Sequence, residues 1–213
     1  MTEIAAEEYG TEYRDESCEF DGKVLQHFGA TDFRVIPGKI RCGLGSNPVG
    51  SLKLPIRKFK RNLDLYRIWG GELVVSGRLA SLTSNGQFSG LSLLPISDIN
   101  EGKQSVNEGN APRRKLSQLV LQSKPLEVAA HSRFGSTPFD TESDGYHRCA
   151  AGVIAGLRPI SPLSIVRSSC DGSDLCRTAV YVSGRVGLFR PYQLLVVSRR
   201  FLTAMKGQAM RGF

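Results

Sequence analysis

Apolar and polar positions follow the same order in two stretches of the chain, residues 73–91 and residues 195–213. In each stretch a short apolar run precedes a serine, Ser76 or Ser198, and the correspondence continues without a gap at an offset of 122 residues. A short apolar run is typical of a buried strand, and a serine after it can cap a helix with its hydroxyl oxygen. Each stretch therefore predicts a strand, a serine-capped helix of roughly three turns, a glycine that ends the helix and a second strand.

A second match lies upstream of each serine. Residues 56–67 and residues 166–177 share an apolar residue followed by arginine, and then an aspartate, a leucine and an arginine at the same internal spacing, at an offset of 110. The two offsets differ by 12 residues, which places an insertion in the second stretch. Alternating apolar residues within 179–191 predict that this insertion forms an extra hairpin. Because the matches occur in the same order, the sequence predicts an internal duplication.

These patterns predict an α/β (α+β) protein of two tandem related strand–helix–strand units with mixed sheets, the second unit carrying the extra hairpin. Turn-rich and charged segments divide the chain further. We expect an acidic flexible arm at 1–17, a first α/β unit at 18–99, a linker or long loop at 100–115 and a second α/β unit at 116–213. No apolar run approaches the roughly 18 residues of a membrane span, and the N-terminal residues are acidic, so we expect no membrane contact and a cytoplasmic location.

The net charge of +8 is unevenly distributed along the chain. Residues 1–22 hold eight acidic side chains and one basic side chain, so the remainder carries about +15. Two stretches concentrate the positive charge, residues 53–67 and residues 177–213. Such patches attract polyanions or acidic protein surfaces. The alternative is a solvated basic face that the acidic arm partly covers.

The C-terminal part resembles a known family. Residues 170–177, residues 194–201 and the pair Gly212-Phe213 are similar to a recurrent C-terminal pattern of bacterial immunity proteins from polymorphic-toxin systems, the double-CXXCG-motif family and its relatives. The resemblance implies a protein that binds and neutralises a cognate toxin without catalysis. The paired CXXCG motifs are absent, because only Arg41-Cys42-Gly43 remains, so the zinc site of a ribbon element does not carry over.

No catalytic set is evident from the residues. The three histidines are scattered, and the glycine-rich run at 43–50 lacks the lysine and hydroxyl residue of a phosphate-binding loop. Five cysteines at uneven spacings fit free thiols better than a disulfide framework or a zinc site. We therefore expect no catalytic residue, no metal and no cofactor.

The best-placed polar and aromatic residues are candidates for contact with a partner, because interfaces are rich in arginine and tryptophan. They are Arg57, Asp64, Arg67, Trp69, Arg167, Asp174 and Arg177. The alternative is structural: aspartate and arginine three residues apart can form an internal ion pair, Asp64 with Arg67 and Asp174 with Arg177. A lone tryptophan is also commonly a core residue.

These observations favour a non-catalytic protein-binding protein, an immunity protein whose partner is a cognate toxin or another protein with an acidic face. A nucleic-acid-binding protein is the first alternative, with the basic stretches 53–67 and 177–213 for charge and Phe59, Tyr66 and Trp69 for stacking. An unrecognised enzyme that acts on a small phosphorylated or carboxylated molecule through Arg167 and Arg177 is the second. The oligomeric state is not predicted.

Overall fold

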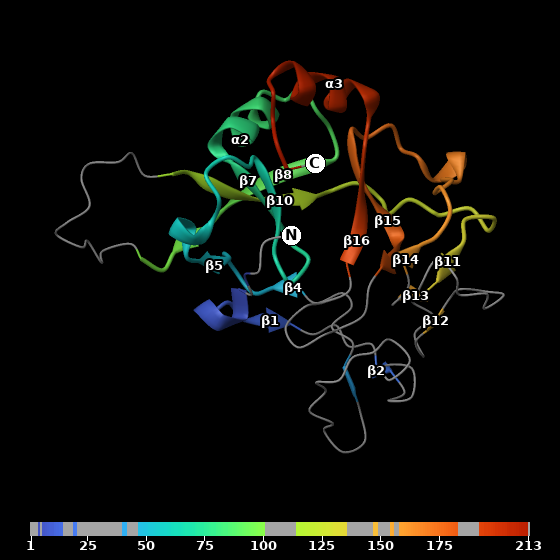
Figure 1. The fold of residues 1–213 in the computed structure, drawn as a ribbon, viewed down its shortest axis with the longest axis horizontal. Helices are drawn as coiled ribbons and strands as arrows, with labels where there is room; N and C mark the ends of the chain where they lie inside the picture. The colour runs from blue at the N-terminus through green and yellow to red at the C-terminus, as the bar shows by residue number, and fades with distance from the viewer. Residues whose placement is uncertain are drawn as a thin grey trace.

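The computed structural model describes residues 4, 6–14, 19–20, 40–41, 47–100, 114–135, 147–148, 154–155, 158–182 and 192–212. Within them the fold is of the α+β class, with several small sheets and two α-helices, as the sequence predicted (Figure 1). Residues 101–113 of the predicted linker and residues 183–191 of the predicted hairpin lie outside this description.

The largest sheet has four antiparallel strands. Their spatial order is β6 (Leu65–Arg67), β7 (Leu73–Ser76), β10 (Leu116–Leu121) and β8 (Leu91–Pro95). The four residues of β7 are all buried, which follows from their apolar run and their central place in the sheet. This sheet and the helix after β7 form what we call the first unit.

A long antiparallel pair, β15 (Leu175–Val182) and β16 (Tyr192–Val197), forms the second unit together with the helix that follows it. Leu175 lies opposite Val197 in this pair, as Leu65 lies opposite Val75 in the first unit. The next two residue pairs also correspond at the offsets of 110 and 122. The two units therefore share element order and strand register, and the duplication that would explain this stays a prediction.

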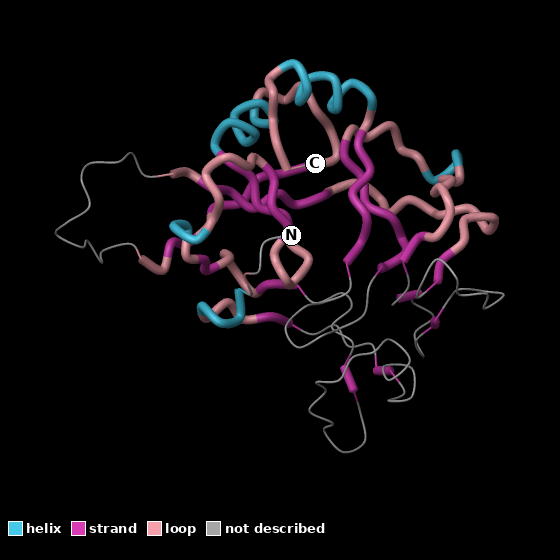
Figure 2. Tube along the Cα trace, viewed as in Figure 1, coloured by secondary structure: helices cyan, strands magenta, loops and turns pink. Residues whose placement is uncertain are grey.

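Both predicted helix caps are confirmed. Helix α2 (Gly77–Ser84) begins after Ser76, whose Oγ accepts a hydrogen bond from the amide of Leu79. Helix α3 (Arg199–Gly207) begins after Ser198, whose Oγ accepts from the amide of Phe201 in the same way. The two helices lie on the same side of the strands (Figures 1 and 2).

The helices are shorter than expected, because α2 has 8 residues and α3 has 9, little more than two turns each. Gly90 and Gly212 therefore do not end the helices. The turn after α2 comes earlier, at Gly86 with φ 67°, and the turn after α3 comes at Ala209 with φ 49°. Gly90 and Gly212 instead occupy positive φ, 83° and 108°, where each segment reaches the opposite unit.

One hydrophobic core joins the two units. Leu79 of α2 and Phe88 after it pack with Phe201 and Met205 of α3, and Phe88 meets Phe201 edge to face with ring centroids 4.9 Å apart. Strand residues of both units, Leu65 and Leu175 among them, line the same core. The units therefore fold against each other as one body.

The strand after the predicted linker belongs to the first sheet. β10 pairs with both β7 and β8, so the sheet of the first unit continues past residue 115, where we had placed the start of the second unit. Propensity alone could not find this pairing, because the partners of β10 lie 20 residues or more away along the chain.

The described part of the predicted insertion belongs to a long strand pair. Residues 179–182 continue β15 and pair again with β16 after an irregularity between Arg177 and Tyr181. The hydroxyl of Thr178 bridges this irregularity, since it donates to the carbonyl of Val180 at 2.8 Å and accepts from the amide of Leu194 at 3.0 Å. The turn that would complete the predicted hairpin lies outside the described residues.

The N-terminal segment packs on the first unit rather than forming a free arm along its described length. Ile4 and Ala6 are buried in a second core with Tyr66 and Val74, and η1 (Ala6–Tyr9) follows them. The carbonyl of Ile4 accepts a hydrogen bond from the amide of Trp69 at 2.9 Å. Apolar side chains within an acidic segment thus hold it in place.

Short elements complete the described chain, and β5–β9 is its parallel strand pair. They are β1 (Tyr13–Arg14) with β4 (Asn47–Pro48), β2 (Glu19–Phe20) with β3 (Ile40–Arg41), β5 (Lys53–Leu54) with β9 (Ser97–Asp98), β11 (Phe134–Gly135) with β14 (Arg158–Pro159), β12 (His147–Arg148) with β13 (Ile154–Ala155), and the 3-10 turns η2 (Ile56–Lys58) and η3 (Arg167–Ser169). Neither α2 nor α3, the α-helices of the described residues, is long and apolar enough to cross a bilayer.

Candidate functional site

Asp64 is the centre of a polar cluster at the start of α2. Its carboxylate is buried, and Oδ1 accepts a hydrogen bond from the hydroxyl of Ser76 at 2.6 Å. Oδ2 accepts from the backbone amide of Arg211 at 3.1 Å and lies 3.7 Å from the guanidinium of Arg78. We call this group, Asp64 with Ser76, Arg78 and the backbone of Arg211, the first carboxylate frame.

Asp174 is surrounded in the same way at the start of α3. Its Oδ1 accepts from the hydroxyl of Ser198 at 2.6 Å, and its Oδ2 accepts from the backbone amide of Ser89 at 3.0 Å. Arg200 donates hydrogen bonds to both oxygens, from Nε to Oδ1 at 3.1 Å and from Nη2 to Oδ2. This group, Asp174 with Ser198, Arg200 and the backbone of Ser89, is the second carboxylate frame.

Each frame is completed by the other unit. The amides of Asp64 and Leu65 donate to the carbonyl of Arg211, which follows α3 in the second unit. The amides of Asp174 and Leu175 donate to the carbonyl of Ser89, which follows α2 in the first unit. In both cases the next residue is a glycine at positive φ, where a Cβ would collide with a leucine carbonyl oxygen of the facing strand.

The second frame holds its charge firmly. Hydrogen bonding to Arg200 keeps the pKa of Asp174 well below its ordinary value, and the Ser198 hydroxyl and the Ser89 amide act in the same direction. The same contact raises the pKa of Arg200. Asp174 is therefore ionised across the physiological range and unsuited to act as a general acid or base there.

The predicted ion pairs of Asp64 with Arg67 and of Asp174 with Arg177 are not present among the described contacts. The aspartates pair with the arginine two residues after each capping serine, Arg78 or Arg200. Both copies of the sequence match carry that arginine, which is the signal that could have found it. Each aspartate immediately precedes a strand, so the i, i+3 geometry that brings side chains together on a helical turn does not apply to these pairs.

Arg67 and Arg177 occupy corresponding strand positions. The guanidinium of Arg67 lies over the ring of Tyr192, 4.2 Å from its centroid, and burial lowers the pKa of Arg67. Arg177 is half-buried in β15. The Nε atoms of both arginines are buried without a hydrogen-bond partner in the described part of the chain.

The other candidates are scattered. Arg57 lies on η2 and Arg167 on η3, and both are exposed. Trp69 is half-buried after β6, and its backbone amide donates a hydrogen bond to the carbonyl of Ile4 in the N-terminal segment. The seven residues singled out from the sequence therefore do not form one site.

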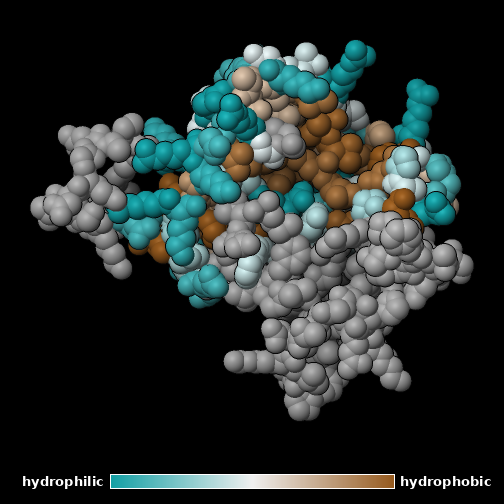
Figure 3. All heavy atoms as spheres, viewed as in Figure 1, coloured by the Kyte–Doolittle hydropathy of each residue, from teal (hydrophilic) through white to brown (hydrophobic). Residues whose placement is uncertain are grey.

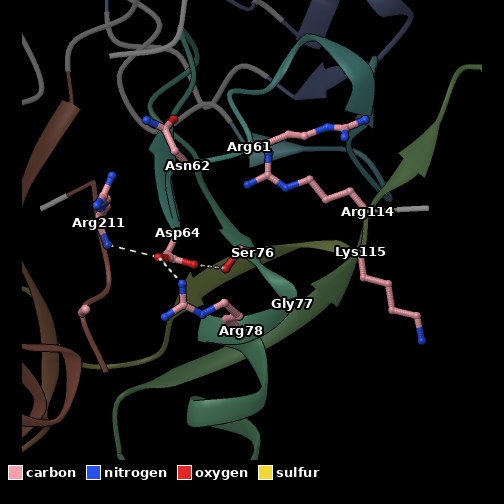
Figure 4. A pocket seen from close by; sticks show the side chains of 10 residues that line it. Arg61, Asn62, Asp64, Ser76, Gly77, Arg78, Arg114, Lys115 and Arg211 are labelled. Carbon is pink, nitrogen blue, oxygen red and sulfur yellow. Dashed lines mark hydrogen bonds and ion pairs between the residues drawn. The ribbon is translucent and has the colours of Figure 1, made fainter. Parts of the chain in front are cut away.

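A pocket of about 470 Å³ opens beside the first carboxylate frame (Figure 4). Five bases and one acid line it, and Figure 4 shows Arg211 on one side of Asp64 with Arg61, Arg114 and Lys115 on the other. The complete lining is Arg61, Asn62, Asp64, Ser76, Gly77, Arg78, Arg114, Lys115, Ala209 and Arg211. On the face shown in Figure 3, hydrophilic residues gather around α2, whereas hydrophobic residues appear on the side of β16.

The pocket draws on both basic stretches of the sequence. Arg61 comes from 53–67 and Arg211 from 177–213, which the fold brings together across the first frame. Arg114 and Lys115 were missed, because they were assigned to a linker. Their signal was a basic run directly before an apolar strand, which places positive charge at the start of β10.

Arg114 organises the loop that carries Arg61. Its guanidinium donates to the carbonyls of Lys60 and Leu63, both at 2.7 Å, and to the hydroxyl of Tyr66. Tyr66 in turn donates to the carbonyl of Leu63 at 2.6 Å, and burial raises the pKa of its phenol. Arg114 contributes its charge to the pocket but has little capacity left for a ligand.

The N-terminal segment contacts two basic residues of the stretch 53–67, which stay exposed. The ammonium of Lys58 donates to the hydroxyl of Tyr9 at 2.7 Å and lies 5.3 Å from the centroid of that ring. Lys53 donates its amide to Thr11 at 2.8 Å. Arg61 is exposed beyond this contact, on the side of the pocket.

Neither cysteine thiols nor metal ligands form a cluster in the part of the chain that the structure describes. Cys170 is exposed and Cys176 is buried, both as free thiols, and burial raises the pKa of Cys176. Among the described residues no group of three histidine, cysteine, aspartate or glutamate side chains is placed to hold a metal ion.

Comparisons with models of protein families, with curated proteins and with solved structures found no match. The frames and the pocket are therefore the observations from which function is argued.

Proposed function

We propose that the protein binds another protein through the basic surface around the first carboxylate frame, and that it neutralises a cognate bacterial toxin in the cytoplasm. The supporting observation is the convergence of Arg61, Lys115 and Arg211 on one pocket from three distant segments. All three side chains are exposed, and the structure records no hydrogen bond or ion pair of their side-chain charges within the described residues. Exposed cations grouped on one face are complementary to an acidic face of a partner.

The two buried aspartates, which have several hydrogen-bond partners within the protein, support a binding role over a catalytic one. The carboxylates of Asp64 and Asp174 are both buried and both engaged by a serine hydroxyl, a backbone amide and an arginine. General acid–base chemistry needs a group that can exchange a proton near neutral pH, which the low pKa of Asp174 does not allow. The two aspartates therefore have structural rather than catalytic roles within their frames.

The nucleic-acid alternative receives less support. Binding of single strands relies on aromatic rings that stack on bases. Phe59 and Tyr66, two of the three rings proposed for stacking, are 3% and 2% exposed and pack edge to face at 5.0 Å in the core. The positive charge needed for nucleic-acid binding is present, but these two rings are not accessible for stacking on bases.

The small-molecule alternative also loses its proposed site. Arg167 is exposed on η3 and Arg177 is half-buried in β15, and neither lines the pocket.

The proposed function is tested by co-expressing this protein with a toxin encoded beside its gene and measuring growth and one-to-one co-purification. We expect wild-type protein to restore growth, and the double variant Arg61→Glu with Lys115→Glu to lose most of the protection because both charges face the pocket. The matched control, Lys124→Glu with Arg133→Glu, makes the same change in net charge at exposed residues beyond the far end of β10. Protection that fails with wild-type protein, or an equal loss in both variants, would contradict the proposal.

A further inference from the structure

The two carboxylate frames share their geometry, but they differ in how tightly the arginine is held. Arg200 contacts both oxygens of Asp174, with Nε at 3.1 Å and Nη2 closer still. Arg78 stays 3.7 Å from Asp64 and turns its Nη2 to the carbonyl of Gln208 at 2.7 Å. The arginine is in direct contact with the carboxylate in the second frame and lies farther away in the first. Both frames nevertheless have a corresponding serine hydroxyl and a corresponding backbone amide on the aspartate.

The surroundings of the frames differ in charge. At the offsets that relate the two units, Arg61 corresponds to Asp171 and Arg211 corresponds to Ser89. With Arg78 and Gly77 included, the positions around Asp64 hold three bases and one acid. With their counterparts Arg200 and Arg199 included, the positions around Asp174 hold two bases and two acids. Arg114 and Lys115 add two further bases to the first frame alone.

Space differs as well. Gly77 lines the pocket beside the first frame, and its counterpart in the second unit is Arg199, a large side chain. The position of Gly77 has ordinary van der Waals room for a Cβ, with the nearest atom, the carbonyl oxygen of Lys115, at 3.5 Å. A missing side chain at the first turn of α2 thus leaves the pocket open next to the positive end of the helix.

We infer that the pocket beside the first frame is an oxyanion site, and that it takes a carboxylate side chain of the acidic protein partner. Asp64 offsets only one of the five positive charges that line the pocket, and its carboxylate already has Ser76, Arg78 and the backbone of Arg211 as partners. The guanidinium groups of Arg61 and Arg211, which have no ion-pair partner among the described residues, and the ammonium of Lys115 supply donors for the incoming oxygens. The second frame, with its ion pair closed and its charges balanced, takes no ligand and holds the fold.

This inference rests on the proposed function only for the source of the anion, an acidic side chain of a protein. Its chemistry is tested without a toxin, by amide NMR of the whole chain during titration with a blocked Glu-Glu-Asp-Glu peptide and, separately, with inorganic phosphate. We expect the peptide to shift the amides of Gly77, Arg78 and Lys115, with a dissociation constant on the order of 1 mM that weakens with added salt. The amides of Arg199 and Arg200 should not move.

A neutral variant keeps the test decisive. Arg61→Gln with Arg211→Gln removes two exposed charges and retains the backbone of Arg211, so its thermal unfolding midpoint should match that of the wild type. Its dissociation constant for the peptide should rise about tenfold. Equal shifts in both units, no shift at Gly77, an unchanged affinity in the variant, or binding of phosphate with none of the peptide would each overturn the inference. If the wild-type protein binds the peptide as expected but does not protect cells from the toxin, that result would instead count against the proposed function.

Discussion

Asp174 carries the most heavily hydrogen-bonded charge among the described residues. Three residues from two segments contribute to it: Ser198 and Arg200 at the start of α3, and Ser89 from the segment after α2. Because the unfolded chain offers none of these contacts, the charge stabilises the folded state wherever the carboxylate is ionised. Because Ser89 belongs to the first unit and Asp174 to the second, these hydrogen bonds also stabilise the contact between the units.

Replacing Asp174 with asparagine should lower the free energy of unfolding by about 1 to 3 kcal/mol at neutral pH, because the hydrogen bonds to an ionised acceptor are lost. The folded pKa of Asp174 is depressed, so its contribution is fully present above the unfolded pKa of about 3.9 and is lost as the pH falls below that value. Urea denaturation at neutral pH and at acid pH should therefore show the two proteins converging in stability. Glu127→Gln, at an exposed residue, should leave the neutral-pH value unchanged.

At the scale of elements, the serine caps could be predicted from the sequence because they depend on local order. Ser76 and Ser198 each follow an apolar run and precede a helix, and hydrogen bonding at the first turn is a short-range property. The length of the helices could not be predicted from the shared glycines Gly90 and Gly212, since these close the segments 85–90 and 208–212, which turn back to reach the other unit. Contacts between distant segments decided their conformation.

The two glycines that follow this turn give a test of the crossing segments. Gly90→Ala and Gly212→Ala should each lower the free energy of unfolding by about 3 kcal/mol or more, because φ is positive and the new Cβ meets a strand carbonyl. Gly86→Ala, at φ 67° with open space around the Cβ position, should lose only about 1 kcal/mol. Chemical denaturation measures all three, and equal losses would show that the close approach has no energetic role.

At the scale of the whole molecule, the two units depend on each other. The core contains side chains of both, and each buried aspartate receives a backbone amide from the opposite unit. The sequence predicted two related units but not this exchange, because strand and helix signals carry no information on which unit a trailing segment will contact. For the same reason the sequence could predict the positive charge of Arg61 and Arg211, but not that these residues and Lys115 line one pocket.

Removing residues 211–213 should weaken the first unit although the deletion lies in the second. The amides of Asp64 and Leu65 lose their acceptor, the carbonyl of Arg211. Hydrogen exchange of the Leu65 amide should accelerate by at least about tenfold, in line with the loss of a buried hydrogen bond. Arg211→Gln keeps the backbone and should leave this exchange unchanged, so acceleration in both variants would point to a role for the side chain instead.

We propose that the two corresponding carboxylate frames have different roles: the second, with its closed ion pair, holds the fold, and the first leaves the pocket beside it open toward a partner. The most direct measurement is the free energy of unfolding of Arg78→Gln and Arg200→Gln under identical conditions. Arg200→Gln should lose about 1 to 3 kcal/mol, because it breaks a two-pronged contact to a buried carboxylate, and Arg78→Gln should lose less than about 1 kcal/mol. Equal losses, or a larger loss at Arg78, would contradict the account.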